Sequence, residues 1–122
     1  MLVADDDAAV GALLHTVLSE IADVTVVADA ESALVRLAED EPYDAIISDF
    51  MLPGIDGVEF VERVRNDEGR THVPILMISG HGANDVSARA KAAGADQFLD
   101  KPFRLQDLRT VVSTMLAPVR FA

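Results

Sequence analysis

The chain has 122 residues, of which half are apolar, and it contains no cysteine. This length suits one domain with one hydrophobic core, and the lack of cysteine argues against a secreted, disulfide-stabilised fold. No apolar stretch is long enough to cross a bilayer and no signal-peptide pattern opens the chain, so we expect a cytoplasmic protein that does not contact membranes.

The net charge of −11 is distributed unevenly along the chain. Residues 1–61 hold fourteen acidic and one basic residue, whereas residues 62–122 hold seven acidic and nine basic residues. An acidic half of this kind repels nucleic acid and attracts cations, so we expect no direct nucleic-acid binding. Most of these charges are typical of a solvated surface, but three consecutive acids at residues 5–7 directly follow an apolar run.

Apolar runs and helical spacing predict five strands that alternate with five helices. The strands are expected at residues 2–4, 24–28, 45–48, 74–78 and 97–100. The first helix is expected at about residues 8–21 with Asp6 or Asp7 as its cap. The second follows its cap Asp29 and ends before Pro42.

The third helix is expected after the turn-forming residues 53–57. The fourth is expected to begin at a cap, Asn84 or Asp85, and to end at Gly94, and the last covers about residues 105–116. For the first, second, third and last helices, helical spacing predicts which side chains face the core. They are Val10, Leu13, Leu14, Val17, Leu18, Ile21, Leu34, Leu37, Ala38, Val58, Val61, Val64, Leu105, Leu108, Val111, Val112 and Met115.

This alternation predicts a doubly wound α/β fold, because right-handed crossovers place helices on both faces of a parallel sheet. We expect residues 1–122 to form a single domain, in which residues 118–122, after the helix-ending Pro118, are a possible start of a linker.

Polar residues stand where four of these strands end. Asp5 and Asp6 follow the first strand, Asp49 the third, Ser79 the fourth and Lys101 the fifth. The carboxyl ends of parallel strands meet at one edge of the sheet, where ligands bind in open α/β folds, so these side chains should lie together.

The chemistry of this set is that of phosphoryl transfer to a carboxylate. A carboxylate can attack phosphorus only if negative charge on both partners is neutralised, and a divalent cation does this. Asp6 and Asp49, with Asp5 nearby, offer the oxygen ligands that Mg²⁺ or Mn²⁺ prefers. Lys101 and Ser79 offer a positive charge and a hydroxyl to the phosphoryl oxygens.

Four motifs resemble those of the response-regulator receiver domains of two-component signalling, as in the chemotaxis response regulator. They are VADDD at 3–7, SDFMLPGIDG at 48–57, MISG at 77–80 and DKPF at 100–103. The resemblance covers essentially the whole chain, in order and with family-like spacing. It implies a flavodoxin-like sheet of strand order 2-1-3-4-5, a fold for which such a regulator is a standard example.

The resemblance also implies a role for each matching residue. Asp49 is implied to accept a phosphoryl group from a histidine kinase or phosphotransfer protein. Asp5, Asp6, Asp49 and the backbone carbonyl of Met51 are implied to bind Mg²⁺ or Mn²⁺. The remaining implied roles are those of Ser79 as switch hydroxyl, Phe98 as switch aromatic and Lys101 as phosphoryl clamp.

The output face implied by the resemblance is formed by residues 84–116, with a downstream protein target or a second copy of the chain as partner. We expect no enzyme in the usual sense, because such a domain catalyses only its own phosphorylation and dephosphorylation.

Two alternatives use related chemistry or the same fold. An aspartate-nucleophile phosphatase typically needs an acid two residues after the nucleophile, where this chain has Met51. A flavin-binding module places its phosphate loop after the first strand, where three acids would repel phosphate.

Overall fold

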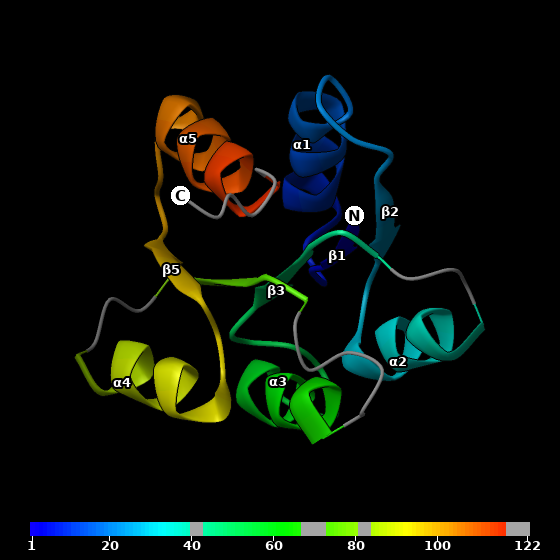
Figure 1. Cartoon of the computed structure of the whole chain (residues 1–122), viewed down its shortest axis with the longest axis vertical. Coiled ribbons are helices and arrows are strands. Elements are labelled where there is room, and N and C mark those ends of the chain that lie inside the picture. Colours follow the sequence, from blue (N-terminus) through cyan, green and yellow to red (C-terminus); the bar gives the residue numbers. More distant parts are fainter. Residues whose placement is uncertain (40–42, 67–72, 81–83, 117–122) are drawn as a thin grey trace, which may run out of the picture.

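A five-stranded parallel sheet runs through the middle of the computed structural model (Figure 1). The structure describes residues 1–39, 43–66, 73–80 and 84–116, apart from the side chains of Asn84 and Asp85. The strands are β1 (Leu2–Ala4), β2 (Thr25–Val27), β3 (Ile46–Asp49), β4 (Ile75–Ser79) and β5 (Gln97–Asp100). Their order is β2-β1-β3-β4-β5, with parallel pairing throughout, which confirms the predicted fold.

Five helices cover the two faces of this sheet (Figure 1). They are α1 (Ala8–Leu18), α2 (Ala30–Glu39), α3 (Gly57–Asn66), α4 (Asn84–Ala93) and α5 (Leu105–Leu116). Helices α1 and α5 lie on one face, and α2, α3 and α4 lie on the other. Two apolar clusters fill the spaces between sheet and helices, one on each face.

The sequence explains why the three middle strands are central. All residues of β1, β3 and β4 are buried, whereas the edge strands β2 and β5 are only partly buried. A strand that is covered on both faces needs a continuous apolar run rather than alternation, and these three strands have such runs up to their polar ends. The carboxyl ends of these strands therefore carry polar groups at the edge of a well-packed sheet.

Aspartates begin three of the helices. The side chain of Asp7 accepts hydrogen bonds from the backbone N–H groups of Ala9 and Val10. Asp29 accepts from Ser32, which lowers the pKa of Asp29, and Asp56 accepts from Glu59. These bonds satisfy N–H groups that have no partner within the helix. Of the two caps predicted for α1, Asp6 or Asp7, the structure shows Asp7, and the predicted cap Asp29 is confirmed. The alternatives predicted for α4, Asn84 or Asp85, are side chains outside the described set.

Some side chains predicted to face the core do not. Leu13, Ile21 and Leu105 are 43%, 45% and 39% exposed, and Ala38 is also exposed. Ile21 lies beyond α1, which ends at Leu18 and not at residue 21. In α2 the buried side is formed by Ala30, Ala33 and Leu37, so Ala38 lies off that side. The predicted roles of Pro42 and Pro118 fall on residues outside the described ones, as does the possible linker at 118–122.

Arg65, in the last turn of α3, fastens three segments at the amino-terminal edge of the sheet. Its guanidinium donates to the carbonyl of Gly94 at 2.9 Å, the carbonyl of Val73 at 2.6 Å and the carboxylate of Asp96 at 2.7 Å. Asp96 in turn accepts from the backbone N–H of Ile75 at 2.8 Å. Because the planar guanidinium presents donors in a fixed fork, one side chain links α3, the start of β4 and the α4–β5 connection.

No helix within the described part of the chain combines the length and the apolar character needed to span a bilayer.

Replacing Arg65 by Met should lower the free energy of unfolding by about 2–4 kcal/mol, because several charge-assisted hydrogen bonds are lost together. Arg63→Met is the matched control on the same helix. Arg63 is half-exposed and pairs only loosely with Glu59 at 3.7 Å, so its loss should cost less than about 0.5 kcal/mol. Urea unfolding followed by circular dichroism measures both, and equal costs would show that the Arg65 network adds no stability.

Candidate functional site

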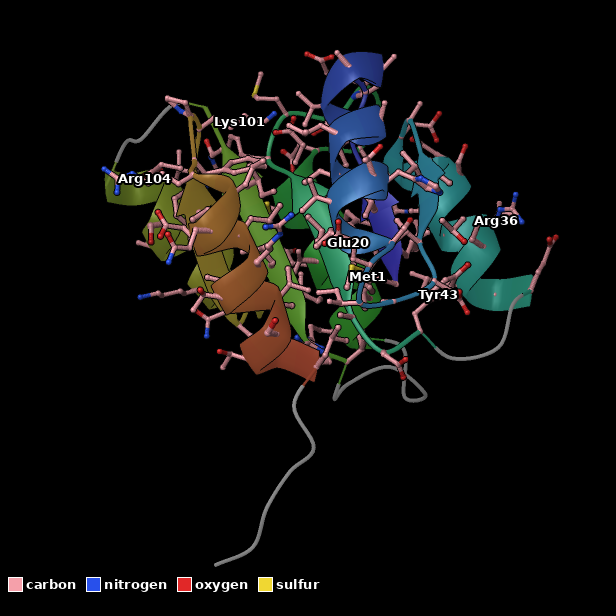
Figure 2. All side chains as sticks on the ribbon, turned by 90° about the horizontal axis from the view of Figure 1, so that it is seen from above. Met1, Glu20, Arg36, Tyr43, Lys101 and Arg104 are labelled. Atoms are coloured by element: carbon pink, nitrogen blue, oxygen red, sulfur yellow. The ribbon has the colours of Figure 1, made fainter. Side chains whose placement is uncertain are left out.

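The parallel sheet brings the polar strand ends to one edge. Asp5 and Asp6 directly follow β1, and Asp49 and Ser79 are the last residues of β3 and β4. Lys101 directly follows β5 and lies at the upper edge of the molecule in Figure 2, away from Met1 and Tyr43. The predicted convergence of these residues at the carboxyl edge is therefore present in the structure.

Three carboxylates form the centre of the site. Asp5, Asp6 and Asp49 each offer an oxygen atom, and these oxygens lie within 4.8 Å of one another. Asp5 and Asp49 are buried, whereas Asp6 is exposed. Backbone N–H groups orient the two buried carboxylates, because Asp5 accepts from Asp7 at 2.9 Å and Asp49 accepts from Met51 at 3.2 Å.

Lys101 supplies positive charge to this acidic group. Its Nζ lies 2.9 Å from Oδ2 of Asp49 and 3.5 Å from Oδ2 of Asp5. Burial by itself would lower the pKa of Lys101, but the hydrogen bond and charge of Asp49, together with Asp5, outweigh this and raise it. The lysine is therefore held in its charged form between the two carboxylates.

Burial makes Asp5 an unfavourable position for a negative charge. Burial raises the pKa of Asp5, the hydrogen bond from the N–H of Asp7 lowers it, and the nearby charge of Asp49 raises it again. The attraction of Lys101 acts in the opposite direction but leaves the net shift upward. A buried carboxylate beside another one is a position at which an added cation is favoured.

Ser79 and Phe98 occupy different environments. Ser79 is fully buried, and its carbonyl accepts from the backbone N–H of Lys101 at 2.7 Å, so the end of β4 directly positions the lysine. Phe98 is partly buried and packs against the apolar cluster on the face of α2, α3 and α4. Ser79 is therefore hydrogen-bonded to Lys101 through the backbone, whereas Phe98 packs against the core on one face of the sheet.

Contacts around the segment after β3 were not predicted. A Cβ atom on Gly57 would lie 2.4 Å from the carbonyl oxygen of Asp49, so α3 can begin against this segment only with glycine there. The guanidinium of Arg89 on α4 lies 5.5 Å from the centre of the Phe50 ring. In the sequence Gly57 belonged to a predicted turn and to the motif at 48–57, but neither indicated this contact, and no local pattern pairs Arg89 with Phe50.

An apolar groove of about 480 Å³ adjoins Lys101. It is lined by Val10, Leu13, Gly80, Lys101, Pro102, Phe103 and Leu105. Leu13 and Leu105, which were predicted to be in the core, are thus exposed because they form walls of this groove between α1 and the start of α5.

The sequence profile of the response regulator receiver domain matches residues 1–113. The chain belongs to the response-regulator receiver family. The match confirms the resemblance drawn from the four motifs, and the cluster of acidic residues at the sheet edge lies within the matched region.

Known proteins and structures similar to this receiver domain support the same assignment. The phosphate regulon transcriptional regulatory protein PhoB of Rhizobium meliloti is 34% identical over 93% of the chain and 50% of its own length. TcrA, a transcriptional regulatory protein of Mycobacterium tuberculosis, is 39% identical over 88% of the chain and 42% of its own length. The receiver domain thus spans about half the length of these relatives.

Two solved structures show the same fold over nearly all of this chain and nearly all of their own. The chemotaxis response regulator CheY4 of Vibrio cholerae has a TM-score of 0.87 and 31% identity, covering 94% of this chain and 96% of that one. The receiver domain of NtrX from Brucella abortus has a TM-score of 0.85 and 30% identity, with the same coverage.

Replacing Lys101 by Met should destabilise the metal-free receiver domain by about 1–3 kcal/mol at neutral pH, because Asp5 and Asp49 would then face each other without a cation. Lys91→Met on the exposed side of α4 is the control and should change stability by less than about 0.5 kcal/mol. Urea unfolding in the presence of a chelator measures both. Equal stability of Lys101→Met and the unchanged chain would show that the lysine does not compensate the acidic pair.

Proposed function

We propose that this receiver domain accepts a phosphoryl group on Asp49 from a phosphohistidine of a histidine kinase or phosphotransfer protein. One observation carries the proposal: the Asp49 carboxylate lies among Asp5, Asp6 and Lys101 at the carboxyl edge of the sheet. In the transfer an Asp49 oxygen forms a bond to phosphorus as the phosphorus–nitrogen bond of the donor breaks, and the donor imidazole takes up a proton. Receiver domains interact with histidine kinases, which fits this donor class.

The carboxylates fit a Mg²⁺ or Mn²⁺ ion by the chemistry of their donor atoms. Asp5, Asp6 and Asp49 bring three oxygens within 4.8 Å, and the backbone carbonyl of Met51 is proposed as a further ligand. Hard divalent cations prefer such oxygen ligands and retain several waters, which the exposure of Asp6 permits. When bound, the ion would neutralise charge on the carboxylates and on the incoming phosphoryl group.

Lys101 and Ser79 are proposed to hold the transferred group. The charged Lys101 ammonium, now paired with Asp49, is placed to pair with a phosphoryl oxygen once Asp49 is modified. The new group carries about −1.5 to −2 charges and needs donors, so the Ser79 hydroxyl should turn toward it. Movement at Ser79 would open space beside β4 into which Phe98 of β5 follows, because Phe98 is paired with Met77 in the sheet.

The output is proposed to leave through residues 84–116. Helix α4 packs through Val86 and Ala90, so it buries little area and can shift at low cost. Arg89, Lys91, Arg104 and Arg109 give this face a basic character, which suits an acidic protein partner or a second copy of the chain. PhoB and TcrA are named as transcriptional regulatory proteins, but the acidic first half makes direct nucleic-acid contact by this domain unfavourable.

Multiple turnover is not part of this proposal. Met51 stands where an aspartate-nucleophile phosphatase would need an acid. Its side chain, 55% exposed, can neither donate nor accept a proton. The domain is therefore proposed to catalyse only its own phosphorylation and dephosphorylation.

Incubation with acetyl phosphate and Mg²⁺ should add one phosphoryl group to the chain, as seen by intact-protein mass spectrometry. Asp49→Asn should abolish the adduct, because the amide cannot act as the nucleophile. Asp44→Asn, an exposed position just before β3 at the other end of the strand, is the control and should retain the adduct. An adduct that persists in Asp49→Asn would place the acceptor elsewhere.

Magnesium binding should depend most strongly on Asp6. Asp6→Asn should weaken binding about tenfold or more while the fold remains intact, since removing one of several clustered charges also relieves repulsion. Asp7→Asn is the matched control, because Asp7 caps α1 and asparagine caps equally well. Titration calorimetry measures both affinities, and an unchanged affinity in Asp6→Asn would assign the acidic cluster a structural role.

A further inference from the structure

A serine hydroxyl is buried in the middle of the sheet, next to the proposed acceptor. Ser48 of β3 is fully buried and lies between Ala4 of β1 and Met77 of β4 in the strand register. Burying a hydroxyl is unfavourable unless it makes a hydrogen bond. The Ser48 Oγ donates to the backbone carbonyl of Asp49 at 3.0 Å.

The Asp49 carbonyl lies just beyond the point where β3 stops pairing with β1. The pairing of β3 with β1 stops at Ser48 and Ala4, whereas the pairing with β4 continues to Asp49 and Ile78. On the β4 side the next N–H, that of Phe50, donates to the carbonyl of Ile78 at 2.8 Å. The peptide group between Asp49 and Phe50 is thus held by β4 through its N–H and by Ser48 through its carbonyl.

The first residue of helix α3, Gly57, packs closely against the same peptide group. The N–H of Gly57 donates to the carbonyl of Phe50 at 3.0 Å, and a Cβ atom on Gly57 would lie 2.4 Å from the carbonyl oxygen of Asp49. The backbone of Gly57 therefore lies close to this carbonyl and restricts its movement toward α3. Its direction is therefore set by the Ser48 hydroxyl and by close packing together.

The direction of this peptide group also affects the carboxylate. The next N–H along the chain, that of Met51, donates to Oδ1 of Asp49 at 3.2 Å, while Lys101 contacts Oδ2. A rotation of the peptide group between Asp49 and Phe50 would displace the N–H of Met51 and release one carboxylate oxygen. The bond from Ser48 acts on that carbonyl through a side chain, so substitution can remove it without disturbing the sheet ladder.

We propose that Ser48 is a positioning residue for phosphorylation: its hydroxyl fixes the peptide after Asp49 and so keeps the carboxylate aimed for attack. The inference rests on the proposed acceptor role of Asp49. Misplacement of a reacting group by a fraction of an ångström slows a reaction even when its chemistry is intact. A serine that merely satisfies its own buried hydroxyl would affect stability but not this rate.

The test is the rate constant for phosphorylation by acetyl phosphate at saturating Mg²⁺, with urea unfolding measured on the same samples. Ser48→Ala should lower the rate constant about three- to thirtyfold. Ser48→Thr keeps the hydroxyl and should stay within about threefold of the unchanged chain. Ser19→Ala, which removes a hydroxyl bonded to the His15 carbonyl at the far end of α1, should leave the rate unchanged.

If Ser48→Ala does not fold, Ser48→Cys replaces it, since a thiol of similar size donates only weakly and should slow the reaction.

Three results would overturn the inference. One is a Ser48→Ala rate equal to that of the unchanged chain. Another is equal slowing in Ser48→Ala and Ser48→Thr, which would point to packing and not to the hydroxyl. In both cases the unchanged chain is still phosphorylated and the acceptor role stands. An unchanged chain that takes up no phosphoryl group would overturn the acceptor role, and this inference with it.

Discussion

The candidate site depends on a lysine whose single positive charge lies beside two carboxylates held close together at the end of the sheet. Asp5 and Asp49 are both buried, and such a pair is unfavourable without a positive charge nearby. Lys101, which directly follows β5, supplies that charge from fifty-two residues beyond Asp49 in the sequence. It reaches the acids only because β5 pairs with β4, where the Ser79 carbonyl accepts its N–H. The order of the strands is thus a condition for the chemistry of the site.

Neighbouring side chains of β3 lie on opposite faces of the sheet and make different contacts. Successive side chains point to opposite faces, so Ile46 packs with the helices α2, α3 and α4 and Ile47 with α1 and α5. By the same alternation Ser48 and Asp49 point to different sides. The Asp49 carboxylate contacts Lys101, while the Ser48 hydroxyl donates to the backbone carbonyl of Asp49. The end of β3 therefore presents the proposed acceptor carboxylate and also holds the backbone next to it in place.

The sequence was most informative where a local pattern determines the structure. Buried runs that end in polar residues predicted the converging acids and Lys101, and the motifs implied the strand order. Helical spacing was less reliable, because it identifies an apolar stripe but not whether another element covers it. Leu13 and Leu105 were assigned to the core for this reason, yet both border an open groove. The contacts of Arg65 with Gly94 and Asp96 could not be predicted, since no local pattern links residues about thirty positions apart.

The attachments of α4 show how a change at Asp49 can reach another part of the surface. The carboxyl end of the helix is fastened, because Arg65 donates to the carbonyl of Gly94, whose φ of 118° ends the helix. Earlier in the helix, Arg89 contacts the ring of Phe50, the residue directly after the proposed acceptor Asp49. Such a contact at an exposed position contributes only about 0.5–1 kcal/mol. A shift of the Asp49–Phe50 peptide would thus act on a weakly held part of α4, while Arg65 keeps the end of the helix in place.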